Sequence, residues 1–286
     1  MTKKSKITIT SLAAVILLVI LSYLLINNSH QDSAKQIDTP TIFVHGWGSS
    51  YHAEESMVRY ARNHGASNSV IRADVSPAGK VKLIGTIKKG AVNPIVEANL
   101  ENNKSVTGSE SDPGKAYSKS SRYVKAIVTA LQKKYRFKKI NLVGHSMGNL
   151  QIIYYLRNNL GTSKMPKLNK LVAIAGHYNG LVREPNSSLK VNQNGSPQKM
   201  SASYRRLLSL RQNFPRNARV LNIYGDTGRG SDGTVPINSS RTLRYLVGSR
   251  ARSYQEKEFH GPNAQHSKLH ENEQVDRVLI KFLWSK

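Results

Sequence analysis

The chain contains no cysteine, which excludes disulfide scaffolds, thiolate nucleophiles, cysteine-bound zinc and iron–sulfur clusters. It also lacks the H-E-x-x-H zinc motif and the G-x-x-x-x-G-K-[ST] phosphate-binding loop. The run GRGSDG at residues 228–233 has the glycine spacing of a dinucleotide-binding loop, but its setting does not follow the strand–loop–helix rule for such sites. We therefore expect neither a cofactor nor a bound metal.

Acidic residues are scarce. The 286 residues include 17 Asp and Glu against 43 Lys and Arg, which gives a net charge of +26. Residues 1–30 hold three of the basic residues and no acid, so the rest of the chain keeps a charge of +23. The hydrophobic fraction of 38% is enough for a large core. The charge favours attraction to anionic cell-wall polymers or lipid headgroups, whereas no nucleic-acid-binding module is recognisable.

A long hydrophobic run lies at the amino terminus. Residues 7–26 carry no charge and come after three Lys within the first six residues. A helix of this length is about 30 Å long, which matches the hydrocarbon core of a membrane, and the preceding Lys residues predict export of the chain beyond this run. We interpret residues 1–30 as a single-pass signal anchor, with a cleaved signal peptide and a secreted protein as the alternative. Residues 31–39 are then a tether, and residues 40–286 form the exported domain.

Strand-like apolar runs alternate with helical patterns throughout residues 40–286. This alternation predicts an α/β fold with a mostly parallel central sheet and helices on both faces. Residues 75–110 are mixed in character, and we expect an inserted hairpin there. The expected strands cover residues 41–44, 70–73, 139–144, 170–175, 219–224 and 253–259, and the expected helices cover residues 51–64, 115–134, 145–160, 203–213, 239–246 and 273–284.

A G-x-S-x-G pattern occurs at Gly144-His145-Ser146-Met147-Gly148, between the apolar strand INLV and the apolar helix LQIIYYL. This is the setting of a nucleophile elbow, a tight turn from strand to helix that holds a serine hydroxyl clear of the sheet. The neighbours must be small, which accounts for the two glycines. An ordinary turn with a structural serine is the alternative. Ser146 is therefore the candidate nucleophile.

A serine nucleophile needs a base, and the base needs an orienting carboxylate, in the chain order serine, acid, histidine. The Asp residues after Ser146 are Asp226, Asp232 and Asp276. We favour Asp232, because it lies in the loop SDGTVP, where Gly233 frees the turn. Asp226 comes directly after a strand and could instead brace the loop, while Asp276 lies in the last helix, after the histidine candidates.

The base should lie in the loop GPNAQHSKLHENEQV, before the last helix. We favour His266, because Leu269 can pack inward and fix the loop around it. His270 is expected at the surface or at the helix entry. His260 ends a strand and is expected to be structural, and His177 precedes the acid and so breaks the order.

The oxyanion formed during acyl transfer needs hydrogen-bond donors. One should be the backbone N–H of Met147, directly after the nucleophile. The second should come from the turn HGWG after the first strand, where Gly46 allows a close approach and the backbone N–H of Trp47 is the candidate. A tight turn without this role is the alternative.

The segments FVHGWGSS, GHSMGN, SDGTVP and AQHSKLHEN together resemble an α/β-hydrolase of the lipase/esterase type. They are similar to a branch of exported cell-surface hydrolases from Gram-positive bacteria, over residues 40–286. The resemblance implies the α/β-hydrolase fold, with Ser146 as nucleophile, Asp232 as acid, His266 as base, and Trp47 and Met147 as oxyanion donors. It implies no particular substrate.

Residues 177–200 occupy the place of a lid, and their apolar residues are scattered among polar ones. A lid that works at a lipid interface needs a broad apolar face, so we expect a carboxylesterase for short or soluble acyl esters. A lipase acting on lipid esters, and a peptidase or amidase with the same triad, remain alternatives within enzymes. A hydrolase fold that binds polyanions without turnover is the alternative from another class.

Overall fold

An eight-stranded sheet forms the centre of the domain. The computed structural model describes residues 16–22, 35–106, 112–159, 161–162, 165–182, 184 and 190–285. All neighbouring strands of the sheet run parallel except β3 and β4, as the sequence predicts for a mostly parallel sheet. In spatial order the strands are β10 (Ser253–His260), β9 (Arg219–Asp226), β8 (Lys167–Ile174), β7 (Lys139–His145), β2 (Thr41–Val44), β5 (Ile95–Leu100), β3 (Val70–Val75) and β4 (Val81–Ile84).

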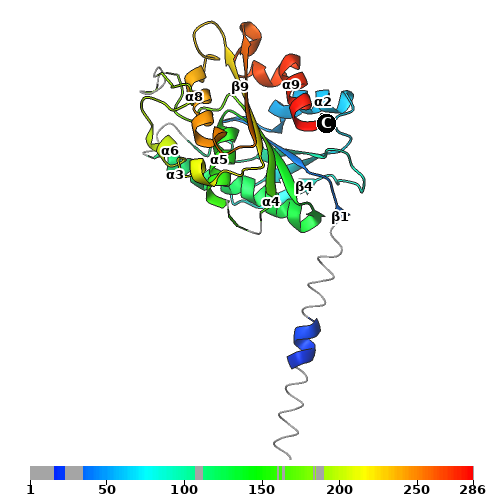
Figure 1. The fold of residues 1–286 in the computed structure, drawn as a ribbon. Helices are drawn as coiled ribbons and strands as arrows, with labels where there is room; N and C mark the ends of the chain where they lie inside the picture. The colour runs from blue at the N-terminus through cyan, green and yellow to red at the C-terminus, as the bar shows by residue number, and fades with distance from the viewer. Residues whose placement is uncertain are drawn as a thin grey trace, which may run out of the picture.

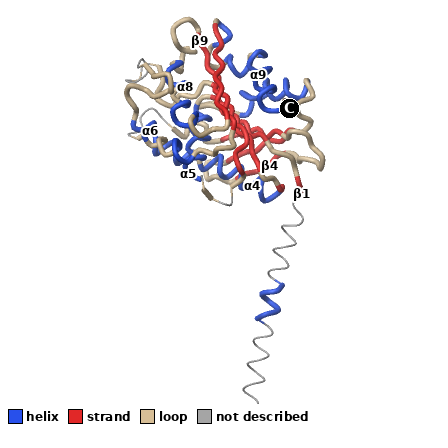
Figure 2. The backbone as a smooth tube through the Cα atoms, viewed as in Figure 1, coloured by secondary structure: helices blue, strands red, loops and turns tan. Residues whose placement is uncertain are grey.

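Helices cover both faces of the sheet (Figures 1 and 2). On one face lie α2 (Glu55–Asn63) and α9 (Glu273–Trp284), whose buried side chains pack in one core cluster. On the other face lie α4 (Arg122–Lys134) and α5 (Met147–Asn159), which contribute to a larger cluster. The prediction of helices on both faces is therefore confirmed.

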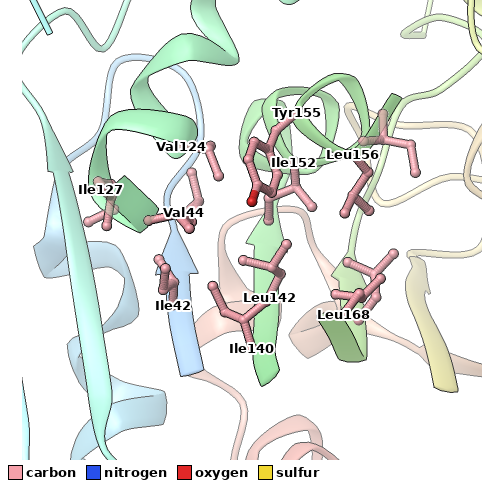
Figure 3. Close-up of a cluster of buried hydrophobic side chains, with 14 of the residues drawn as sticks. Ile42, Val44, Val124, Ile127, Ile140, Leu142, Ile152, Tyr155, Leu156 and Leu168 are labelled. Atoms are coloured by element: carbon pink, nitrogen blue, oxygen red, sulfur yellow. The ribbon is translucent and has the colours of Figure 1, made fainter. Parts of the chain in front are cut away.

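The larger core lies between the central strands and two helices. Figure 3 shows Ile42 and Val44 of β2 and Leu142 of β7 facing Val124 of α4 and Ile152 of α5. The intervening Phe43 packs in the cluster on the opposite face. Strands that are buried on both faces need continuous apolar runs, which explains why TIFV and KINLV carry so few polar residues.

Residues 75–110 differ from the predicted hairpin. Its first strand, β4, does form a hairpin, but with the preceding strand β3 and not with the second strand-like run of the segment. The second part is β5, a parallel strand inserted between β2 and β3. Its run IVEANL is almost entirely buried, so it belongs to the middle of the sheet.

Three predicted helices are each divided in two. The helix expected over residues 115–134 breaks at Ser121, because the hydroxyls of Ser120 and Ser121 bond back to the carbonyls of Tyr117 and Ser118 and compete with the helical pattern. This first helix becomes α3 (Pro113–Ser120) and α4. The helix expected over residues 203–213 becomes α6 (Ala202–Arg205) and α7 (Leu210–Asn213). The helix expected over residues 239–246 becomes α8 (Ile237–Arg241) and a π-helical turn, Arg244–Gly248.

The predicted membrane span falls mostly outside the described residues. Within residues 7–26, the structure describes the helical piece 16–22. No helix in the described ranges is both long and apolar enough to cross a bilayer. The chain joins the domain at β1 (Lys35–Gln36), which pairs with β6 (Tyr135–Arg136), just before β7.

Candidate active site

Ser146 occupies the turn between β7 and α5. Its φ of 50° lies in the left-handed region, which costs free energy for a residue with a Cβ atom. Hydrogen bonds hold the turn: the Ser146 N–H donates to the Ile174 carbonyl at 3.0 Å, and its own carbonyl accepts from Asn149 at 3.1 Å. A Cβ atom at Gly148 would overlap the Val44 carbonyl oxygen, so this position tolerates only glycine. The local geometry is that of the expected elbow.

Three predicted residues meet in one hydrogen-bonded chain. His266 Nε2 lies 2.9 Å from Ser146 Oγ, and His266 Nδ1 lies 2.8 Å from Asp232 Oδ2. An ionised carboxylate can only accept, so its contact places the imidazole proton on Nδ1 and leaves Nε2 free to accept from the serine. Such an arrangement can remove the serine proton during attack on a carbonyl.

Asp232 is held by its own loop. The residue is 1% exposed, and its Oδ1 accepts the backbone N–H groups of Thr234 at 2.9 Å and Val235 at 2.6 Å. Both carboxylate oxygens therefore have donors. Such donors fix the orientation of the group.

The His266 backbone is fixed on both sides. Its N–H donates to the Asp232 carbonyl at 3.0 Å, and its carbonyl accepts from His145 Nε2 at 3.0 Å. Burial, and then the neighbouring His266 and His270, lower the pKa of His145, so this donor is a neutral imidazole. Leu269 is fully buried, as predicted.

The HGWG turn passes directly beside the serine. A Cβ atom at Gly46 would lie 3.1 Å from Ser146 Cβ, so the backbone there is close to the nucleophile. His45 braces the turn, because it accepts from the Leu100 N–H at 3.0 Å and donates to the Gly46 carbonyl at 2.8 Å. Met147 is the first residue of α5, where a backbone N–H has no partner within the helix. Both candidate oxyanion donors thus belong to segments that border Ser146.

The other candidate acids and bases lie elsewhere. Asp226 Oδ1 accepts the N–H groups of Gly228, Arg229 and Gly230 at 2.8 to 3.0 Å, so it braces the loop. Its carboxylate, with that of Glu258 and the ring of His260, offers ligand atoms that all lie within 4.8 Å of one another, a grouping that sequence spacing did not indicate. Asp276 is buried in α9, with neither carboxylate oxygen hydrogen-bonded among the residues that the structure describes.

His270 corrects one half of an expectation. It lies at the entry to α9, as one alternative had it, but it is buried and not at the surface, and the centre of its ring lies 4.8 Å from that of His145. Leu269 and His270 belong to one tight 3-10 turn, Lys268–Glu271, so the inward packing of Leu269 also buries His270. Burial is the main cause that lowers the pKa of His270.

His177 is a neighbour of the site that chain order had set aside. Its Nε2 lies 2.9 Å from Tyr117 Oη, and burial, together with the nearby His266, lowers its pKa to about 3. The signal that could have found it is its place just after β8, since the carboxyl ends of parallel strands share one edge of the sheet. Tyr117 also packs against a small cluster of Val106, Ala116 and Met147.

A pair of buried carboxyl groups, Glu54 and Glu97, lies where the 3-10 turn Tyr51–Glu54 contacts β5. Glu54 is 1% exposed, and neither of its carboxylate oxygens has a hydrogen-bond partner among the described residues. Burial, and then repulsion from Glu97, raise the pKa of Glu54 to about 8. Burial and the charge of Glu55 raise the pKa of Glu97 to about 7.

Comparisons with known proteins agree with this architecture. Residues 28–286 match the family described as "Alpha/beta hydrolase of unknown function (DUF915)". The lin2722 gene product of Listeria innocua has 26% identity and a TM-score of 0.77, covering 87% of this chain and 95% of its own. A protein described as a cell surface hydrolase from Lactobacillus plantarum has 24% identity and a TM-score of 0.70, with 86% and 91% covered.

More distant similarity extends to a lipase-esterase related protein from Clostridium acetobutylicum. It has 14% identity and a TM-score of 0.50, and the match covers 87% of this chain and 96% of that one. At this identity the likeness concerns the fold alone. Among curated proteins, none matches the chain.

Proposed function

The chain belongs to the DUF915 family of α/β-hydrolases, and we propose that it is a serine hydrolase, a carboxylesterase for short or soluble acyl esters. The observation that carries the proposal is the continuous chain of hydrogen bonds from Asp232 through His266 to Ser146. Each atom in it has the partner that nucleophilic catalysis requires.

In the acylation step, Ser146 Oγ attacks the ester carbonyl carbon while His266 Nε2 takes its proton. Asp232 stabilises the imidazolium that forms, and the N–H groups of Met147 and Trp47 receive the oxyanion. Collapse of the tetrahedral intermediate breaks the bond to the alkoxy oxygen, which takes the proton from His266. Water then repeats the sequence on the acyl-enzyme, releasing the acid and restoring the serine.

The surroundings of Ser146 support a small acyl group. The apolar side chains of Val106, Ala116 and Met147 form a separate cluster of three buried residues, with Tyr117 packed against it. The polar Tyr117–His177 pair lies beside this cluster. A few apolar side chains bounded by polar ones suit a short acyl chain better than an extended one.

A panel of p-nitrophenyl esters with graded acyl length tests the proposal, using the full-length protein in detergent. We expect acetate and butyrate to be hydrolysed faster than long-chain esters. Preference for long chains would identify a lipase, and cleavage of p-nitroanilides in place of esters would identify an amidase. Absence of turnover together with absence of fluorophosphonate labelling would leave a polyanion-binding module.

We further propose that the domain is exported and held at the cell membrane by residues 7–26. The uncharged run and the preceding Lys residues support this proposal. Protease added to intact protoplasts should remove the domain, and the intact protein should sediment with membranes. Protein found free in the medium with its first residue near position 30 would mean a cleaved signal, and protection from protease would refute export.

A further inference from the structure

The edge of the sheet opposite Ser146 carries a single acid, Asp38, in the described segments that lead into the strands or end the helices there. We call these segments the amino edge. Their described residues hold 17 Lys and Arg against this one acid, although the whole chain has 17 acids. The amino edge comprises residues 37–40, 62–70, 85–94, 133–140, 157–159, 161–162, 165–170, 211–219, 249–253 and 281–285.

Basic side chains line two of the hollows that open on this edge. One, of about 600 Å³, lies where β9 and β10 begin and α9 ends, and it is lined by Arg219, Arg252 and Lys281. The other, of about 210 Å³, includes Lys167 and Arg216. Neither is lined by an Asp or Glu of the described chain, and each also has apolar lining. Hollows with several cations and an apolar floor suit a phosphate group that carries an apolar remainder.

The chain enters the domain at the same edge. β1 pairs with β6, Lys35 opposite Tyr135, and the Ile37 N–H donates to the Arg136 carbonyl at 3.0 Å. Figure 1 shows β1 at the rim of the domain, near α4. The apolar run ends at Ile26, and the nine residues from there to Lys35 reach at most about 30 Å.

We propose that the amino edge binds anionic lipid headgroups, so that the domain lies against the membrane with the Ser146 edge directed away from it. The proposal rests on the membrane anchor proposed above. The short link brings the amino edge close to the bilayer, and basic residues near an anionic surface are attracted within about one Debye length, ~10 Å at 0.1 M salt. Lipid is the occupant we commit to, because a link of at most about 30 Å keeps this edge next to the bilayer, where the headgroups lie.

The two tryptophans of the chain report the orientation. Trp284 ends α9 at the amino edge, whereas Trp47 follows Gly46, which approaches Ser146 at the opposite edge. We would reconstitute full-length Trp47→Phe and Trp284→Phe variants in vesicles with a dansyl-headgroup lipid and measure energy transfer. With equimolar phosphatidylglycerol and phosphatidylcholine, transfer from Trp284 should exceed transfer from Trp47. Salt that shortens the Debye length to about 3 Å should remove most of the difference.

Charge reversal supplies the matched test. Arg219→Glu, Arg252→Glu and Lys281→Glu together should reduce Trp284 transfer on phosphatidylglycerol vesicles to the level seen on pure phosphatidylcholine. The control reverses three exposed charges at the opposite edge, Lys80, Lys115 and Arg229, and should keep the transfer of the parent protein. Thermal melting of both variants checks that they fold.

The outcomes separate the two proposals. Sedimentation with pure phosphatidylcholine vesicles measures the anchor alone, so its failure refutes the anchor, while sedimentation with phosphatidylglycerol would still support the amino edge. Equal transfer from the two tryptophans on phosphatidylglycerol, or equal behaviour of the two triple variants, would overturn the docking surface. Displacement of Trp284 transfer by soluble poly(glycerol phosphate) but not by anionic vesicles would also overturn it, in favour of a wall polymer.

Discussion

Asp232 and Glu54 are two carboxyl groups with the same exposure, 1%, and opposite surroundings. Asp232 accepts hydrogen bonds from two backbone N–H groups and from His266. Glu54 has no hydrogen-bond partner among the described residues and lies near the second carboxyl of Glu97. Burial alone therefore does not decide what a carboxyl group does, because the donors around it determine whether its charge is stabilised.

The difference arises from local backbone geometry. The loop SDGTVP turns at Gly233, which has a φ of 92°, and so directs successive N–H groups at the Asp232 side chain. Glu54 ends a short 3-10 turn, Tyr51–Glu54, and packs under the sheet beside β5. A carboxylate that is held by hydrogen-bond donors can orient a catalytic base. A buried carboxyl group without donors instead makes the free energy of unfolding depend on pH.

The largest effect should come from removing the candidate nucleophile, Ser146, which ends the hydrogen-bonded chain that begins at Asp232. Ser146→Ala should lower ester turnover about 10⁶-fold, to the background that binding and oxyanion donors supply. Steady-state rates with p-nitrophenyl acetate measure the change, and unaltered melting shows that the fold is kept. Equal fluorophosphonate labelling of the variant and the parent would exclude Ser146 as the nucleophile.

Asp232→Asn replaces the hydrogen-bonded carboxylate with a neutral amide. An amide cannot hold the Nδ1–H tautomer of His266 as a charged acceptor does, so turnover should fall about 10⁴-fold. The rate with p-nitrophenyl acetate again measures the effect. A mild loss here, with a severe loss for Asp226→Asn, would transfer the acid role to Asp226.

Glu54→Gln should make the stability of the fold less dependent on pH, which tests the contrast between Glu54 and Asp232. The raised pKa, about 8 in the fold against an ordinary 4.5, means that the native state holds a proton which the unfolded chain releases. Stability should therefore fall as pH rises from about 4.5 to about 8, by up to about 4 kcal/mol. Urea unfolding at pH 5 and pH 9 measures this, and the Gln variant should show a smaller fall. Identical pH dependence in both proteins would contradict the assignment.

Asp226→Asn should have the smallest effect. Asp226 Oδ1 only accepts backbone N–H groups, and an amide oxygen can accept the same bonds. We expect turnover within about tenfold of the parent, since the loop keeps its bracing. The same ester assay serves, with Asp232→Asn measured beside it.

The strand–turn–helix pattern around Ser146 was predictable because local requirements fix it. Apolar runs specify buried parallel strands, and Gly148 is required where a side chain would strike β2. The choice of Asp232 over Asp226 also came from local loop chemistry. The structure places Asp232 and His266 where the motifs predicted them, and their catalytic roles stay predictions for the substitutions at Ser146 and Asp232 to test.

Other features depend on contacts between distant segments. β5 lies inside the sheet because its buried run finds two parallel neighbours, which no local pattern reveals. The burial of His270 and the pairing of His177 with Tyr117 arise where separate elements converge on one edge. Chain order set His177 apart from Asp232 and His266, but it could not show that the residue borders the site.

The left-handed backbone at Ser146 has a consequence for how the chain would evolve. A residue with a Cβ atom in this conformation costs about 1–2 kcal/mol, which a glycine would recover. Serine at position 146 is thus less favourable for folding stability than glycine would be. Lineages that no longer need the reaction should drift toward glycine at position 146, gaining stability as they lose the hydroxyl.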